Sequence, residues 1–228
     1  GDRQSLTEAS GITYTPSERW TLGATLETGE VRDLTAGDFD RTAVSVVTSS
    51  AAGDDVTARL RLEYREDDGD GIAQDRETFG LSASYSNKIN PDWRLLANLD
   101  ALYSDSAEGD FRDGEYLKFQ LGYAYRPVDN ERLNMLFRYT LLNDLPGEDQ
   151  VTSNGSINGP QQRSHVLSFN GSYDVSQALT ASVKLGYRKS EVAERGTDTF
   201  TDSTASLAAL RLDWHIVHKW DAFAETRF

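Results

Sequence analysis

The sequence predicts an all-β fold, an antiparallel up-and-down transmembrane β-barrel of which about twelve strands are visible. Three observations support this. Apolar and polar residues alternate in stretch after stretch, short and long connections alternate along the chain, and aromatic residues gather near the ends of the alternating stretches. Nothing in the 228 residues is typical of an interdomain linker, so we expect one domain over residues 1–228.

The clearest strand pair lies within residues 114–142. Every second residue is apolar or aromatic over 117–125, and after a turn at 127–131 the pattern resumes over 133–141. One face is therefore continuously apolar. The other face mixes charged, amide, small and a few apolar side chains, which suits the wall of a wet lumen better than the inside of a sandwich.

The same alternation indicates the remaining strands. They are expected near residues 12–14, 20–26, 41–49, 56–65, 79–85, 93–103, 167–173, 179–187, 208–214 and 220–228. The stretch at 41–49 is weak, because Val44, Val46 and Val47 do not settle which residues share a face. Long polar connections are expected at 28–40, 104–113 and 143–162, where turn-forming residues dominate.

Composition excludes several classes of protein. No run of about 18 apolar residues is present, which excludes a helical membrane span. The lack of cysteine removes disulfides, thiolate zinc sites and cysteine nucleophiles. A net charge of -14 without a basic, aromatic-rich patch argues against nucleic acid. No signal peptide is visible at Gly1, so an exported protein is expected to be a processed or excised chain.

Aromatic residues of the apolar face fall into two groups. Those beside the short turns are Tyr14, Trp20, Tyr85, Trp93, Tyr125, Tyr173, Trp214 and Trp220, and those at the far strand ends are Tyr64, Tyr103, Tyr139 and Tyr187. Tyr and Trp are good strand formers, but strand propensity would not sort them by end. Two belts are typical of the two interfaces of a bilayer.

Repeated strand-turn-strand units such as LSASYSNKINPDWRLLANLDALY and LKFQLGYAYRPVDNERLNMLFRYTL resemble proteobacterial outer-membrane β-barrel proteins of the porin and large transporter type. The resemblance covers nearly the whole chain at the level of class. It implies a location in the bacterial outer membrane, contact with membrane lipid and lipopolysaccharide, assembly by the barrel-assembly machinery, and contacts with other envelope proteins. It assigns no catalytic residue.

The strand count places both chain ends on the side of the long connections, whereas complete barrels of this class have both on the periplasmic side. We therefore expect a segment of a larger barrel of 14 or more strands, lacking strands at one or both ends. A miscounted strand near Ala43 would reverse this inference.

Charged residues are expected on the polar, lumen-lining face. They are Arg59, Arg61, Glu63, Arg94, Asp100, Lys118, Arg138, Lys184, Arg188, Arg211 and Asp213. Such a wall creates a field that selects ions or solutes, and its mixed to slightly basic charge predicts a weak anion preference. The alternative is a ladder of cross-strand ion pairs that stabilises the wall and plugs a narrow lumen.

One acidic stretch approximates a calcium loop. Glu66, Asp68 and Asp70 take alternate positions, and Glu77 falls where a bidentate carboxylate would close the shell. The first ligand is Glu rather than Asp, and no helices are expected beside it. The alternative is a solvated acidic loop that divalent ions bridge to lipopolysaccharide phosphates. No other cofactor is expected.

The histidines are His165, His215 and His218, and no nucleophile or carboxylate pair is expected beside them, so we predict no enzyme. The sequence favours a channel or transporter barrel that passes ions or small solutes through a polar lumen. Two alternatives stay open: a barrel that anchors or exports a domain absent from this chain, and a soluble β-sandwich, whose strands are rarely this long.

Overall fold

The structure, a computed structural model, describes residues 3–33, 38–53, 55–69, 76–106, 114–144, 160–194, 199–217 and 220–228. These residues form twelve strands and no helix, which confirms the all-β prediction. The strands are β1 (Arg3–Ser17), β2 (Trp20–Asp33), β3 (Phe39–Ala52), β4 (Val56–Gly69), β5 (Arg76–Lys88), β6 (Trp93–Ser106), β7 (Gly114–Tyr125), β8 (Leu133–Asn143), β9 (Pro160–Ser176), β10 (Leu179–Glu194), β11 (Thr201–Val217) and β12 (Trp220–Arg227).

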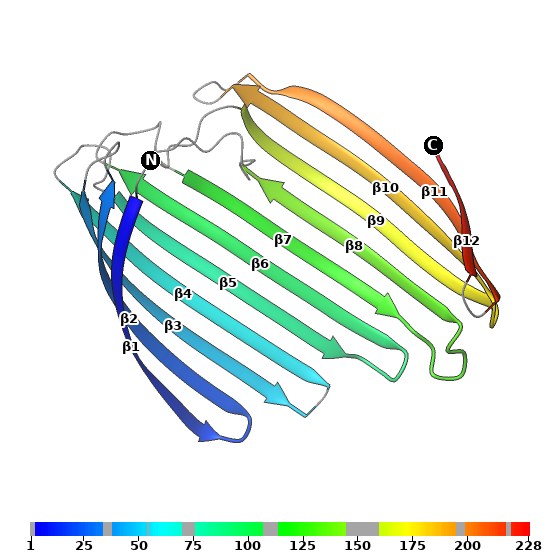
Figure 1. The fold of residues 1–228 in the computed structure, drawn as a ribbon, viewed down its shortest axis with the longest axis horizontal. Coiled ribbons are helices and arrows are strands. Elements are labelled where there is room, and N and C mark those ends of the chain that lie inside the picture. Colours follow the sequence, from blue (N-terminus) through cyan, green and yellow to red (C-terminus); the bar gives the residue numbers. More distant parts are fainter. Residues whose placement is uncertain are drawn as a thin grey trace.

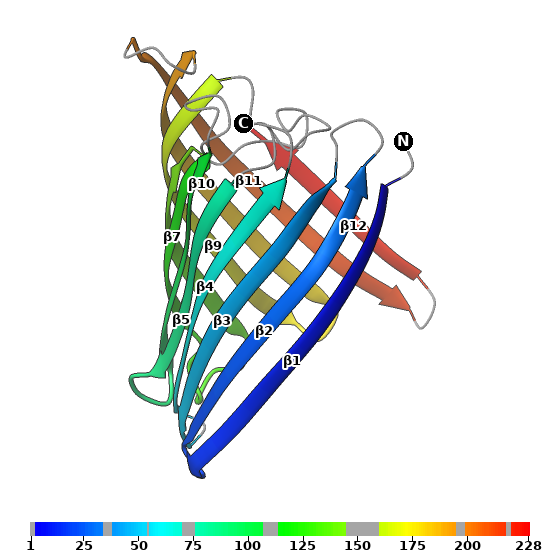
Figure 2. The ribbon, with the colours of Figure 1, turned by 90° about the vertical axis from the view of Figure 1, so that its left-hand side faces the viewer.

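Every strand pairs with its neighbours in the sequence, and every pair described is antiparallel. The result is one sheet in the order β1 to β12, with β1 and β12 at its two edges (Figure 1). The sheet curls into a trough, as the view turned by 90° shows (Figure 2). Among the described residues, no helix has the length and apolar composition needed to cross a membrane.

The strand register joins apolar residues to apolar residues across the sheet. Val46 of β3 lies opposite Leu62 of β4, Leu62 lies opposite Leu81 of β5, and Leu81 lies opposite Ala101 of β6. Because a slip by one residue would move every side chain to the other face, this register holds the alternating pattern on one side. We call this side the apolar face and the opposite side the polar face.

Burial identifies the polar face as the concave one. The polar or charged residues that are buried among the described ones all lie on it; they are Ser45, Asp67, Thr78, Ser104, Ser164 and Ser190. Large apolar side chains such as Ile12, Leu210 and Leu212 stay 71%, 55% and 49% exposed on the other face. Curvature crowds side chains on the concave side and spreads them on the convex side, so the apolar face points outward, as a lipid-facing surface must.

Several strands are longer than the sequence predicts. The polar connection expected over 28–40 is strand up to Asp33 and again from Phe39, and β4 continues through Glu66 and Asp68 to Gly69. These ends carry polar residues on both faces, so they lack the alternation that marks a half-buried strand. Backbone pairing with the adjacent strand extends them, which a pattern of side chains does not record.

The weak strand near Ala43 exists as β3, so the strand count holds. Val44 and Val46 lie on the apolar face and Val47 on the polar face, opposite Arg61. The first strand runs toward the short turn before Trp20 and the last runs away from the short connection after Val217. Both free strand ends therefore lie at the end of the sheet where the longer connections join it (Figure 1).

Candidate functional site

The concave polar face is the candidate functional surface. The register places all of the predicted lumen-lining residues on it: Arg59, Arg61, Glu63, Arg94, Asp100, Lys118, Arg138, Lys184, Arg188, Arg211 and Asp213. They come from β4, β6, β7, β8, β10 and β11. Their charges are distributed unevenly, and the two halves of the sheet differ in how those charges are balanced.

In the first half of the sheet, two ion pairs form on the polar face of β3 and β4. The Arg41 guanidinium donates from Nε and Nη2 to the two carboxylate oxygens of Asp67, at 2.6 and 2.9 Å, from adjacent strands. Arg61 and Glu63 form a second pair at 2.6 Å within β4. A bidentate pair of this kind fixes two strands against each other and leaves little net field. These two pairs match the stabilising ladder that sequence reasoning considered, whereas Arg59 and Arg94 on the same face form no ion pair with any described residue.

The Arg41–Asp67 pair was missed by the sequence analysis. Asp67 fell in a stretch interpreted as an acidic loop, and the uncertain parity around Val44 left the face of Arg41 open. In the structure the Asp67 side chain is only 10% exposed and that of Arg41 is 26% exposed. The signal in the sequence was an arginine and an aspartate at facing ends of two consecutive predicted strands. It indicates a cross-strand ion pair only if the second strand is extended by two residues, to Asp67.

In the second half, cations stand in a staggered series that we call the cation ladder: Lys118, Arg138, Lys184, Arg188 and Arg211. Each occupies its own level of the register. From the short-turn end, Arg211 is level with Ser182, Lys184 comes next, and Arg138 lies one level further, beside Ser168. Successive levels are two residues apart, or about 7 Å along a strand.

Most of the ladder is not neutralised. Arg211 pairs with Asp213 at 2.6 Å and with Glu225 at 3.5 Å. Within the described ranges, Arg138, Lys184 and Arg188 form no ion pair. Their partners across the strands are neutral, such as Asn170 beside Lys184. Since unpaired cations attract anions along a polar wall, this half can bind and pass negative charge.

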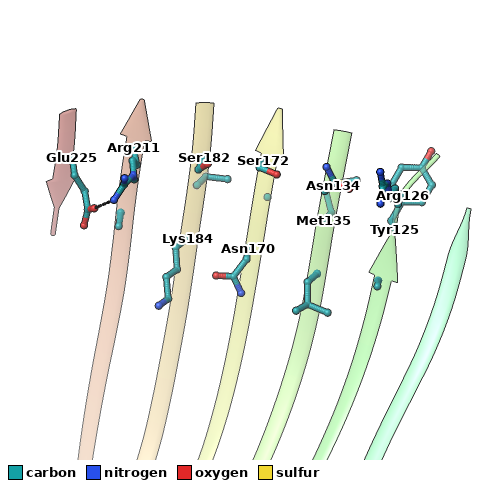
Figure 3. A pocket seen from close by; sticks show the side chains of 15 residues that line it. Tyr125, Arg126, Asn134, Met135, Asn170, Ser172, Ser182, Lys184, Arg211 and Glu225 are labelled. Atoms are coloured by element: carbon teal, nitrogen blue, oxygen red, sulfur yellow. Dashed lines mark ion pairs between the residues drawn. The ribbon is translucent and has the colours of Figure 1, made fainter. Parts of the chain in front are cut away.

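A hollow opens at the short-turn end of the ladder (Figure 3). Its volume is about 540 Å³, and Lys184, Asn170 and Arg126 lie around it with Asn134, Ser172 and Ser182. The pair between Arg211 and Glu225 lies at one side. Amides, hydroxyls and cations together can hydrogen-bond a small solute that carries hydroxyl groups and a negative charge.

The opposite, apolar face carries all of the predicted interface aromatics: Tyr14, Trp20, Tyr85, Trp93, Tyr125, Tyr173, Trp214, Trp220, Tyr64, Tyr103, Tyr139 and Tyr187. Trp93 packs against Tyr123 and Tyr125, with ring centroids 4.4 and 4.3 Å apart. Trp93 and Tyr103 lie on the same strand. Their separation of about 34 Å along it becomes about 26 Å at a strand tilt of about 40°, the height of a membrane band.

The acidic stretch is arranged differently from the predicted loop. Glu66 and Asp68 lie within β4 on the apolar face, and Glu77 of β5 lies directly opposite Glu66. Asp70 lies outside the described residues. Among the described side chains, no group of three or more His, Cys, Asp or Glu residues is gathered as metal ligands would be. The calcium site stays a prediction.

The histidines are separated in space. His165 lies on the apolar face, where its Nδ1 is 2.7 Å from the Tyr139 hydroxyl oxygen. His215 lies on the other face, with its Nδ1 2.5 Å from Asp221 Oδ1 at an exposed strand end. His218 lies outside the described residues. Each of these two histidines thus makes a hydrogen bond at an exposed position, on opposite faces of the sheet.

Comparison with known proteins gives a likeness of fold. Neither a protein-family model nor a curated protein sequence matches the chain. Among solved structures it is similar to the alcaligin outer-membrane receptor FauA from Bordetella pertussis, with a TM-score of 0.61 and 13% identity over 97% of this chain and 40% of that one. The copper transporter OprC follows, with a TM-score of 0.45 and 14% identity over 99% and 52% of the two chains.

The outer-membrane protein OpdK from Pseudomonas aeruginosa has a TM-score of 0.42 and 16% identity over 100% of this chain and 62% of its own. The chain thus spans between 40% and 62% of the length of these three proteins. The chain has the fold of bacterial outer-membrane β-barrel proteins, in agreement with the outer-membrane location that its sequence predicts.

Proposed function

We propose that this chain forms the wall of an outer-membrane channel or transporter, which passes ions or small solutes through a polar lumen and favours anions. The observation that carries this proposal is the cation ladder on the concave face. Arg138, Lys184 and Arg188 lie beside neutral residues, so their charge acts on the solution beside the wall. A field of this kind raises the local concentration of anions and lowers that of cations.

The hollow beside Lys184 supports a resting position for a solute at one end of the ladder. A carboxylate or phosphate there would interact with Lys184 and Arg126, while Asn134 and Asn170 would hydrogen-bond hydroxyl groups. Passage then proceeds from one cation to the next, in steps of about 7 Å along the strands and one to three strand spacings of about 4.8 Å across them. Weak, repeated binding of this kind lets a solute enter and also leave.

The two edges of the sheet support a larger barrel. Strands β1 and β12 do not pair with each other, so each leaves one row of backbone groups without a partner in the sheet. An open edge is not stable within hydrocarbon, because each unsatisfied amide or carbonyl group there costs several kcal/mol, in the range of about 2–7. We infer that further strands complete the wall and enclose the lumen.

The test is the reversal potential of the full-length protein in a planar bilayer with a salt gradient. We expect stable conductance and a reversal potential on the anion-selective side. A channel that selects cations would contradict the role of the ladder. A protein that inserts without conducting would favour the anchor or export conduit over a channel.

A further inference from the structure

A small apolar patch interrupts the polar face on β6 to β8. Leu96 of β6 lies opposite Gly122 of β7, and Ala124 of β7 lies opposite Leu136 of β8. A Cβ atom at Gly122 would lie 3.5 Å from Leu96 Cβ and 3.8 Å from Leu136 Cδ1, so the two leucines flank this glycine. Both leucines are half-buried and keep apolar surface open to the concave side. We call these four residues the inner apolar patch.

Four cations border the inner apolar patch on the same face. They are Lys88, Arg94, Arg126 and Arg138. None of them forms an ion pair with a described residue. Lys88 lies directly opposite Arg94, and like charges in this arrangement destabilise a sheet unless an anion lies between them. Among the described strand positions that adjoin the patch, none is Asp or Glu, so the border attracts anions.

Two hollows adjoin the patch. The hollow beside Lys184, of about 540 Å³, is lined by Ala124 and Leu136 as well as by the polar groups labelled in Figure 3. A second hollow, of about 480 Å³, is lined by Ala124 together with Lys88, Arg94 and Arg126. Both volumes lie in the range of about 300–1,000 Å³ that is typical of small-molecule sites. Uncharged amides complete the border; they are Asn98, Gln120, Asn134 and Asn170.

Two carboxylates of the short turns, those of Asp92 and Glu131, also line the second hollow. Asp92 Oδ1 accepts a hydrogen bond from the Val128 amide at 2.7 Å, and the Asp92 carbonyl oxygen accepts one from the Arg126 amide at 2.8 Å. Asp92 therefore joins the two turns to each other. The four border cations outnumber these two carboxylates, so the site keeps a positive charge.

Apolar surface inside a border of cations suits an anion that has an apolar body. An apolar ring that covers Leu96 and Leu136 removes their surface from water, which is favourable. An anion with hydroxyl groups all around would have to set some of them against the leucines, where they lose hydrogen bonds to water. A carboxylate on the ring can reach the border, because Arg94 lies directly opposite Ala124, one strand spacing of about 4.8 Å away.

We propose that the inner apolar patch binds small anions that carry an apolar ring, with aromatic carboxylates as the class of solute. The ring lies on Leu96 and Leu136, and the carboxylate accepts hydrogen bonds from the border arginines. The inference deepens the proposed function and rests on it, since it names the class of solute that pauses within the lumen. The binding site can nevertheless be tested apart from ion passage.

The first test compares three probes on the full-length protein in nanodiscs of zwitterionic lipid: benzoate, gluconate and benzyl alcohol. Ligand-observed NMR titrations give the dissociation constants, and empty nanodiscs correct for partition into lipid. Benzoate should bind at least about fivefold more tightly than either of the others, because gluconate lacks an apolar ring and benzyl alcohol lacks a charge. Equal binding of benzoate and either of the other probes would overturn the proposal.

The second test uses the variant Leu136→Asn, which removes apolar surface without changing charge. It should bind benzoate at least about fivefold more weakly than the wild type does and bind gluconate equally well. Leu142→Asn is the matched control, because Leu142 lies on the same face of the same strand but beside Lys118 and Ser164, away from the patch. Unchanged benzoate binding by a folded Leu136→Asn variant, or an equal loss in Leu142→Asn, would contradict the proposal.

The two proposals fail in different ways. A channel that selects anions but binds the three probes equally would contradict the aromatic carboxylate site and leave the proposed function standing. A protein that prefers benzoate in nanodiscs but does not conduct in planar bilayers would contradict the channel and support the binding site.

Discussion

Three ladder cations lie beside neutral residues and form no ion pair with any described residue, and replacing them should remove most of the anion preference. The variant is Arg138→Gln, Lys184→Gln, Arg188→Gln, in which each glutamine keeps a polar side chain on the concave face. For an anion about 5 Å from one of these charges, Coulomb's law in water gives about 0.8 kcal/mol, or about a fourfold change in local concentration. Because the same charge lowers the local cation concentration by the same factor, Lys184→Gln alone should lower the ratio of anion to cation permeability by up to about sixteenfold.

The triple variant should lower this ratio further, because successive replaced cations are about 12 Å apart, from about 7 Å along the strand and two strand spacings of about 4.8 Å, close to the Debye length of about 10 Å at 0.1 M salt. The assay is the reversal potential across a planar bilayer under a salt gradient. The effect should shrink at 1 M salt, where the Debye length is about 3 Å. A matched control is Arg61→Gln, Glu63→Gln, which removes an ion pair without changing the net charge. An unchanged reversal potential in the triple variant would refute the reasoning.

Three further predictions concern stability and membrane position. Asp67→Asn breaks the ion pair with Arg41 and should lower the free energy of unfolding by about 2 kcal/mol, less than the roughly 3–5 kcal/mol of a fully buried pair because the Arg41 side chain is 26% exposed. Urea unfolding in lipid vesicles measures this loss, and a value below about 0.5 kcal/mol would contradict the prediction. Gly29→Ala should lower the free energy of unfolding by about 1–3 kcal/mol in the same assay, since the added Cβ would lie 2.9 Å from the Leu6 carbonyl oxygen. Gly23→Ala should be tolerated, because its Cβ would lie 3.8 Å from the nearest atom, the Ile12 carbonyl oxygen. Trp20, Trp93, Trp214 and Trp220 are predicted to form a belt at the short-turn end, so tryptophan fluorescence should be quenched more strongly by lipids brominated near the headgroup than by lipids brominated at the chain end. The reverse order would exclude such a belt.

The face assignment could be predicted from sequence wherever the alternation was strict. In β4 and β7 each apolar residue predicted to face outward does so. A side chain in a strand can point only to one face of the sheet or the other, so strict alternation is enough to assign both faces. The weak segment around Val44, Val46 and Val47 shows the limit. Three valines that suit either environment leave the parity open, and pairing with Leu62 and Arg61 settles it.

The balance of charge could not be predicted in the same way. Arg41 and Asp67 are separated by 26 residues in sequence and meet across β3 and β4 only because both strands extend past the alternating region. The levels of Lys184 and Arg138 likewise depend on the registers of β8, β9 and β10 taken together. A count of charges gave a mixed wall, whereas the structure shows which charges pair, such as Arg41 with Asp67, and which lie beside neutral residues, such as Lys184.

The sequence by itself determined the class of fold, the strand order and the two faces, because a period of two and alternating connection lengths act locally along the chain. The tertiary structure decided how far each strand runs, where the sheet curves, and which charges meet. These depend on backbone pairing and on the side chains of neighbouring strands, so no single stretch of sequence contains them. The cation ladder is a consequence of register, which sets one residue of a strand beside a distant one and decides which charges share a level.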